Sequence, residues 1–109
     1  MRQAIVLYKN KEAGILTQKD DGSFVYKYHE LWHNDSSKPG ISLSLPKLKQ
    51  EYFSEHMFPF FFNMLPEGTN KEMVCKYHKI DLKDYFSLLM ITAKRDNIGA
   101  VSIIKILTE

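Results

Sequence analysis

The chain has 109 residues, enough for one small domain over residues 1–109, and 44% of them are hydrophobic, which excludes an intrinsically disordered protein. The 15 basic and 13 acidic residues are scattered, so the net charge of +2 provides no block that would follow a nucleic-acid backbone. A single cysteine, Cys75, excludes an internal disulfide framework and fits a reducing compartment. We find no signal peptide and no apolar run near ~18 residues, so we expect a cytoplasmic protein that does not contact a membrane.

The start of the chain predicts three antiparallel strands, at residues 3–9, 13–19 and 23–29. A turn at residues 10–12 joins the first two, and Gly14 marks a bulge or a close approach of backbone in the second. The Asp21-Gly22 pair is typical of a tight hairpin turn.

A polar loop at residues 33–40 follows, and then residues 41–45 alternate between apolar side chains and serines. This alternation predicts a half-buried strand that Pro46 ends. Residues 50–56 have no clear period.

The most apolar stretch of the chain is residues 58–68 (FPFFFNMLPEG). Pro59 suits the first position of a helix, and Pro66 disfavours helical backbone at Leu65, so we expect a short helix followed by a turn at Glu67 and Gly68. Its apolar side chains occupy more than one helical face. They either fill the core or leave one face for another protein.

Two helices and a final strand are predicted after this stretch, at residues 70–77, 82–92 and 100–107. Thr69 and Glu72 have the spacing of a capping box, and Asp81 suits an N-cap with Asp84 as a second acid in the first turn. The apolar last strand predicts a central place in the sheet. The order predicts an α+β fold, a small, strongly bent antiparallel sheet of about five strands with three short helices packed on it.

The sequence has no motif for chemistry of its own. Its five glycines occur singly, and nothing resembles a phosphate-binding loop. Cys75 and His78 with three dispersed histidines do not make a zinc pattern, and helix capping explains the pair Asp81 and Asp84. The Arg95-Asp96 pair is read as turn capping. We expect a non-enzymatic domain without metal or cofactor.

Three motifs occur in order, at residues 41–46 (ISLSLP), 61–68 (FFNMLPEG) and 95–101 (RDNIGAV). Together they resemble the N-terminal subdomain of HipA-type serine/threonine kinase toxins, over about residues 5–106. Two departures are Lys94, where the family often has glycine, and Met64 in place of the commoner leucine. Because the chain stops just after its last strand, it looks like HipS, the free-standing version in three-component HipB–HipS–HipT systems.

This resemblance implies binding and neutralisation of a HipT-like kinase, while a HipB-like helix-turn-helix protein handles DNA. An excised N-terminal subdomain of a full-length HipA remains an alternative. A small nucleic-acid-binding module, which would stack bases on Tyr26 and Tyr28, is a rival that the balanced charge disfavours.

The predicted partner contact is the turn of Asn63, Met64, Leu65, Pro66, Glu67 and Gly68. Met64 and Leu65 would be apolar anchors, Pro66 would hold the shape of the turn, and Glu67 would meet a basic group. Trp32 is the second candidate, since tryptophan is enriched in binding hot spots. The alternatives are that Met64 and Leu65 fill the core and that Trp32 is a lid over one end of the sheet.

Overall fold

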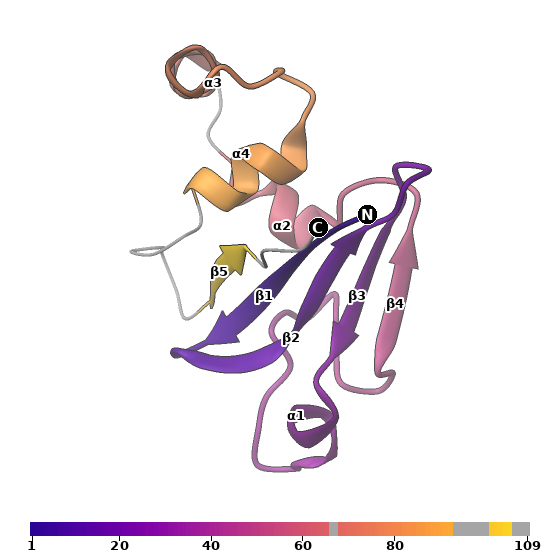
Figure 1. The fold of residues 1–109 in the computed structure, drawn as a ribbon. Helices are drawn as coiled ribbons and strands as arrows, with labels where there is room; N and C mark the ends of the chain where they lie inside the picture. Colours follow the sequence, from indigo (N-terminus) through magenta and orange to yellow (C-terminus); the bar gives the residue numbers. More distant parts are fainter. Residues whose placement is uncertain (66–67, 93–100, 106–109) are drawn as a thin grey trace.

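The computed structural model describes residues 1–65, 68–92 and 101–105 (Figure 1). Its strands are β1 (Arg2–Tyr8), β2 (Lys11–Gln18), β3 (Phe24–Tyr28), β4 (Glu51–Ser54) and β5 (Val101–Lys105). Its helices are α1 (Glu30–Asn34), α2 (Pro59–Phe62), α3 (Gly68–His78) and α4 (Tyr85–Thr92). The α+β prediction is confirmed, with four helices rather than three among the described residues because the sequence reading missed α1.

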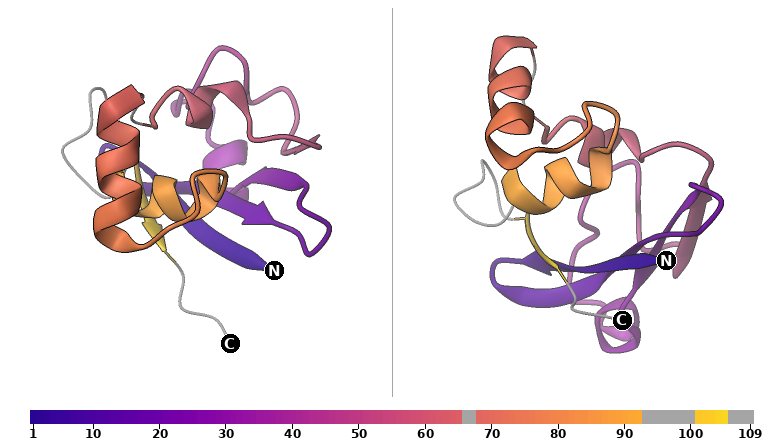
Figure 2. Two further views of the ribbon diagram at one scale, coloured as in Figure 1. Left: turned by 90° about the horizontal axis from the view of Figure 1, so that it is seen from above. Right: turned by 45° about the horizontal axis from the view of Figure 1, so that its top comes forward.

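The strands form one antiparallel sheet in the order β4-β3-β2-β1-β5, and the sheet is not closed into a barrel. Side chains alternate between its faces. One face carries the buried Ala4, Leu16 and Tyr26, which lie opposite one another in the register. The helices α2, α3 and α4 lie on this side of the sheet, so the core is the layer between them and the strands (Figure 2).

The first hairpin turns one residue earlier than the sequence predicted. Lys9 and Asn10 both have positive φ, 51° and 68°, so they form the two-residue turn and residues 11 and 12 already belong to β2. In the second hairpin Gly22 supplies the positive φ of 91°, as expected of Asp21-Gly22.

Gly14 lies at a bulge and at a close approach, which confirms its prediction. The pairing of β1 with β2 shifts between Val6 and Leu7, so one residue of β2 is left over beside Gly14. A Cβ at Gly14 would lie 2.4 Å from Tyr26 Oη and 2.5 Å from the Lys27 carbonyl oxygen, so no larger residue fits.

The predicted strand at residues 41–45 is wrong, because this segment is a loop. The Leu45 amide donates to the Ser42 carbonyl at 3.1 Å, which folds the segment into a turn. Leu43 is fully exposed at its tip, instead of facing the core with its neighbours. The Tyr28 hydroxyl donates to the Leu45 carbonyl. The loop is therefore fixed by a side chain of β3, and not by backbone pairing with a neighbouring strand.

The final strand is also placed differently from its prediction. β5 pairs with β1 and stands at one end of the strand order, so it is an edge strand. Its apolar sequence is explained by the helices rather than by a central position. Val101 and Ile103 are buried, and β5 contacts α4.

Candidate interaction site

The predicted contact segment begins where α2 ends. Pro59 opens the helix, as expected, and the amides of Asn63, Met64 and Leu65 donate to carbonyls three or four residues earlier at 2.9–3.1 Å. These bonds tighten the last turn and carry the chain away from the helix axis.

The structure divides the predicted residues of this turn into two groups. Asn63 is exposed and Met64 is half-buried, whereas Leu65 is only 8% exposed and packs in the core. Gly68 is the first residue of α3, and Pro66 and Glu67 lie outside the described residues. The described part of the turn therefore offers one polar and one apolar side chain, with Leu65 supporting them from below.

The core covers α2 incompletely, which is one of the two alternatives that the sequence left open. Phe61 is fully buried and contacts the Tyr26 ring at 5.9 Å between centroids. Phe62 is 45% exposed, and its ring meets the Tyr85 ring of α4 edge-on at 5.3 Å. Phe62 thus adds an apolar surface beside Asn63 that the sequence analysis did not single out.

Trp32 occupies the position of a lid. It is 5% exposed, its ring centroid lies 5.7 Å from that of Tyr8, and its Nε1 donates to the Pro39 carbonyl at 2.9 Å. The Lys38 ammonium lies 5.3 Å from the centre of its ring. These contacts close the end of the sheet beside α1, and the part of Trp32 in partner binding stays a prediction.

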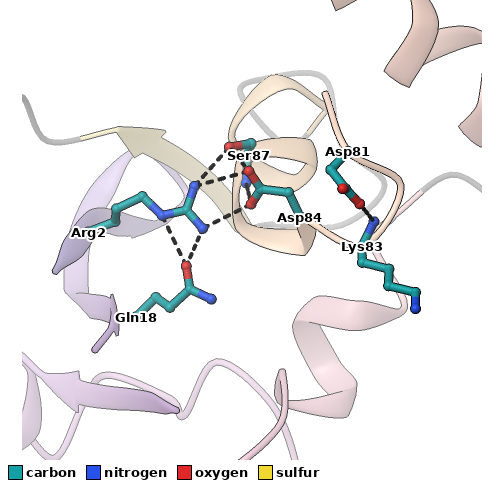
Figure 3. Close-up of polar contacts among 6 residues, drawn as sticks. All are labelled: Arg2, Gln18, Asp81, Lys83, Asp84 and Ser87. Atoms are coloured by element: carbon teal, nitrogen blue, oxygen red, sulfur yellow. Dashed lines mark hydrogen bonds and ion pairs between the residues drawn. The ribbon is translucent and has the colours of Figure 1, made fainter. Parts of the chain in front are cut away.

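A polar cluster that the sequence reading missed ties the start of β1 to the start of α4 (Figure 3). The Arg2 guanidinium donates to Asp84 at 2.9 Å, to Ser87 Oγ at 2.8 Å and to Gln18 Oε1 at 3.0 Å. Its guanidinium carbon also lies 4.9 Å from the centre of the Phe86 ring. Arg2 thus joins two strands and a helix at one end of the core.

Asp84, rather than Asp81, caps α4. The Ser87 amide donates to Asp84 Oδ1 at 3.2 Å and the Ser87 hydroxyl donates to Oδ2 at 2.8 Å, while Asp81 accepts from the Lys83 amide in the preceding turn (Figure 3). Burial raises the pKa of Asp84, but the hydrogen bonds from Arg2 and Ser87 outweigh it and hold this pKa below its ordinary value. The spacing of Asp84 and Ser87, an N-cap acid with a polar residue three positions on, was the available sequence signal.

Metal-ligating side chains are dispersed over the described residues. Within the ranges given above, no three His, Cys, Asp or Glu side chains lie close enough to hold a metal ion. Cys75 is buried, and Arg95 and Asp96 lie outside the described residues. Tyr26 and Tyr28 are fully buried, so they present no ring face to a nucleic-acid base, and the basis of that rival is wrong. Among the residues described, every helix is too short or too polar to cross a membrane.

The family model described as HipA N-terminal domain matches residues 4–104. The chain belongs to the HipA N-terminal domain family. A solved structure described as the N-terminal domain of HipA toxin superimposes with a TM-score of 0.71 at 22% identity, covering 100% of this chain and 96% of that one. This second likeness shows the fold.

The chain is similar to curated proteins of two different sizes. An uncharacterized protein of Haemophilus influenzae is 30% identical over 76 residues, which are 70% of this chain and 71% of that protein. The putative kinases Y4mE and Y4dM of Sinorhizobium fredii are 27% and 30% identical and match 77% and 81% of this chain. The chain spans only 20% and 23% of their lengths.

Proposed function

We propose that this HipA N-terminal domain is an antitoxin-type protein that binds and neutralises a HipT-like serine/threonine kinase. A HipB-like helix-turn-helix protein would complete the system and contact the DNA. The observation that carries the proposal is the H. influenzae relative, because the match covers 71% of that protein. The domain family therefore occurs in a small protein, for which a kinase would be a separate chain.

The proposed action is binding, without catalysis, in the cytoplasm. Its proposed contact is the turn after α2, where Asn63 is exposed and Met64 is half-buried. Pro66, Glu67 and Gly68 would complete the contact, with Glu67 facing a basic group of the kinase. Leu65 supports the turn, and its removal would act on stability as well as on binding.

Co-expression tests this proposal directly. The domain is expressed with a HipT-like kinase encoded beside its gene, and growth and co-purification on a tagged kinase are measured. The proposal expects restored growth and a stable complex. Failure of the wild-type domain to associate, or phosphorylation of a substrate by the purified domain alone, would contradict it.

Paired variants test the turn. Asn63→Arg adds a charged side chain at an exposed position, so we expect weaker kinase binding and a nearly unchanged thermal midpoint. The matched control is Leu43→Arg, at a fully exposed loop position far from the turn in the sequence. If Asn63→Arg binds the kinase as tightly as Leu43→Arg and the wild-type domain do, the turn is not part of the contact.

The alternative, that the domain is the N-terminal part of a full-length HipA kinase, is favoured by Y4mE and Y4dM, in which the matching region is a small share of the protein. The intact mass of the native protein, isolated with an antibody against the domain, distinguishes a free-standing domain from a part of a full-length kinase. A mass near 12.8 kDa supports the free-standing protein, and a several-fold larger mass supports the alternative.

A further inference from the structure

The face of the sheet that points away from the helices is apolar at its centre. The register places Ile5 opposite Ile15, and Thr17 opposite Val25, on the face opposite to the buried Ala4 and Leu16 rows. In both views of Figure 2 the helices α2, α3 and α4 lie on the other side. Within the described part of the chain, these three helices therefore leave the outer face uncovered.

Its composition is mixed, because Gln3, Thr17, Lys27 and Glu51 are polar while four apolar side chains stand beside them. An antiparallel sheet with one wet face normally carries polar residues on that face. Here Ile5, Ile15 and Val25 are half-buried in the middle strands, and Phe53, opposite Val25 in the register, is 61% exposed on the edge strand β4. An apolar surface of this kind on a small domain indicates an interface.

The charges on this face favour a protein partner over a polyanion. Lys27 and Glu51 lie opposite each other on β3 and β4, so their charges offset one another. At the end of the face near α1, a hollow of about 240 Å³ is lined by Ile15, Lys27, Glu30 and Gln50 among others. A nucleic acid or an anionic membrane would need a basic excess, which these residues do not supply.

The size of the face indicates that a partner also covers surface around it. Strand spacing and rise give a footprint of about 400 Å² for this face. A standard stable interface buries about 800 Å² on each partner. A flat face of this size is smaller than that, so a partner must also cover neighbouring surface such as the hollow near α1.

We propose that the outer face of the sheet, centred on Ile5, Ile15, Val25 and Phe53, is a docking surface for the kinase, a surface additional to the turn after α2. This inference rests on the proposed function. In Y4mE and Y4dM the matching region accompanies a much longer polypeptide, which is available to cover such a face. In the free-standing domain, the separate kinase covers this face in place of that polypeptide. The matching surface of the kinase is mainly apolar and weakly charged.

The test compares variants on the two sides of the domain. Phe53→Arg and Val25→Arg change the outer face, and Met73→Arg and Tyr77→Arg are matched controls on α3, where the side chains are 63% and 82% exposed. Kinase affinity is measured by calorimetry and folding by the thermal midpoint. We expect at least about tenfold weaker binding for the outer-face variants and less than about threefold change for the controls.

Each outcome decides one question. Phe53→Arg is the reference variant if Val25→Arg fails to fold, because Phe53 already faces solvent. Unchanged affinity of a folded Phe53→Arg variant, with a wild-type domain that binds the kinase, overturns the docking surface and leaves the proposed function intact. Absence of wild-type binding overturns the proposed function itself. A wild-type dimer that Phe53→Arg dissociates would assign the face to a second copy and also overturn the inference.

Discussion

At the scale of single residues, two buried tyrosine hydroxyls on β3 differ in their hydrogen bonding. Tyr28 Oη accepts from the Ile41 amide at 3.0 Å and donates to the Leu45 carbonyl, so it holds both ends of the loop. Tyr26 Oη is buried and has no hydrogen-bond partner among the described residues. Burial first, and the neighbouring Tyr28 second, raise the pKa of Tyr26 far above its ordinary value, so it stays protonated.

This contrast predicts different effects for the same substitution. Tyr28→Phe should lower the free energy of unfolding by about 1–3 kcal/mol, since it leaves the Ile41 amide and the Leu45 carbonyl unpaired. Tyr26→Phe removes an unpaired polar atom and should leave stability unchanged or raised. Urea unfolding of both variants measures the difference. Equal losses in the two variants would show that the loop does not depend on Tyr28.

The cap of α4 makes a prediction about pH. The pKa of folded Asp84 lies below its unfolded value of about 4, so its carboxylate stabilises the fold above that pH and loses this effect as pH falls through the folded pKa. The wild type should therefore lose stability below about pH 4 more steeply than Asp84→Asn. At neutral pH the variant should be less stable by at most about 1 kcal/mol, because an asparagine can still cap the helix but carries no charge to pair with Arg2.

Denaturant unfolding between pH 2 and 7 checks this prediction. The Asp84→Asn curve should keep a residual slope, because hydrogen bonds from Ser23 and Ser37 also lower the pKa values of Asp21 and Asp35. Parallel curves for the variant and the wild type would show that the Arg2–Asp84 contact does not distinguish the folded from the unfolded state.

At the scale of elements, the sequence predicted most strands because their alternation is local. It was wrong at residues 41–45, where the same alternation belongs to a loop. Ile41 and Leu45 are buried there because the Tyr28 hydroxyl binds both of their backbones, and no local pattern reports so distant a contact. The edge position of β5 was missed for a similar reason, since burial under α4 and burial between strands demand the same apolar residues.

The bulge in β2 gives a prediction for the hairpin that it bends. Gly14→Ala should destabilise the domain by about 1–3 kcal/mol, because its Cβ would lie 2.5 Å from the Lys27 carbonyl oxygen. Adding Tyr26→Phe should not restore stability, since the backbone clash remains. Gly22→Ala is the control for a glycine with positive φ and open space around it, and should cost about 1 kcal/mol. Thermal unfolding of the three variants checks the order.

At the scale of the whole molecule, the family motifs could be recognised in the sequence, whereas the exposed surface could not be predicted from it. The turn after α2 could be proposed as a contact from the sequence because its residues are consecutive, yet the burial of Leu65 and Trp32 depends on packing from other elements. The outer face of the sheet could not be found from motifs, because Ile5, Ile15, Val25 and Phe53 come from four strands. Only the register brings them together.

The distribution of buried side chains predicts unequal local stability. In α4, Phe86, Leu88 and Leu89 are essentially fully buried, whereas Cys75 is the one buried side chain among those described in α3. Hydrogen exchange followed by NMR should therefore show faster exchange for amides in the middle of α3 than for those of α4. Amides of β1, which pairs with β2 and β5, should exchange slowest. Equal protection of α3 and α4 would contradict this reading of their packing.

The pairing of β1 with β5 joins residues 4–8 to residues 101–105. On a ribosome, β1 emerges long before β5, so its second edge is not hydrogen-bonded until β5 has been synthesised. During that interval the edge is open to chaperones and to other nascent chains, so the rate of translation and the supply of a holdase should influence how much of the domain reaches its native form.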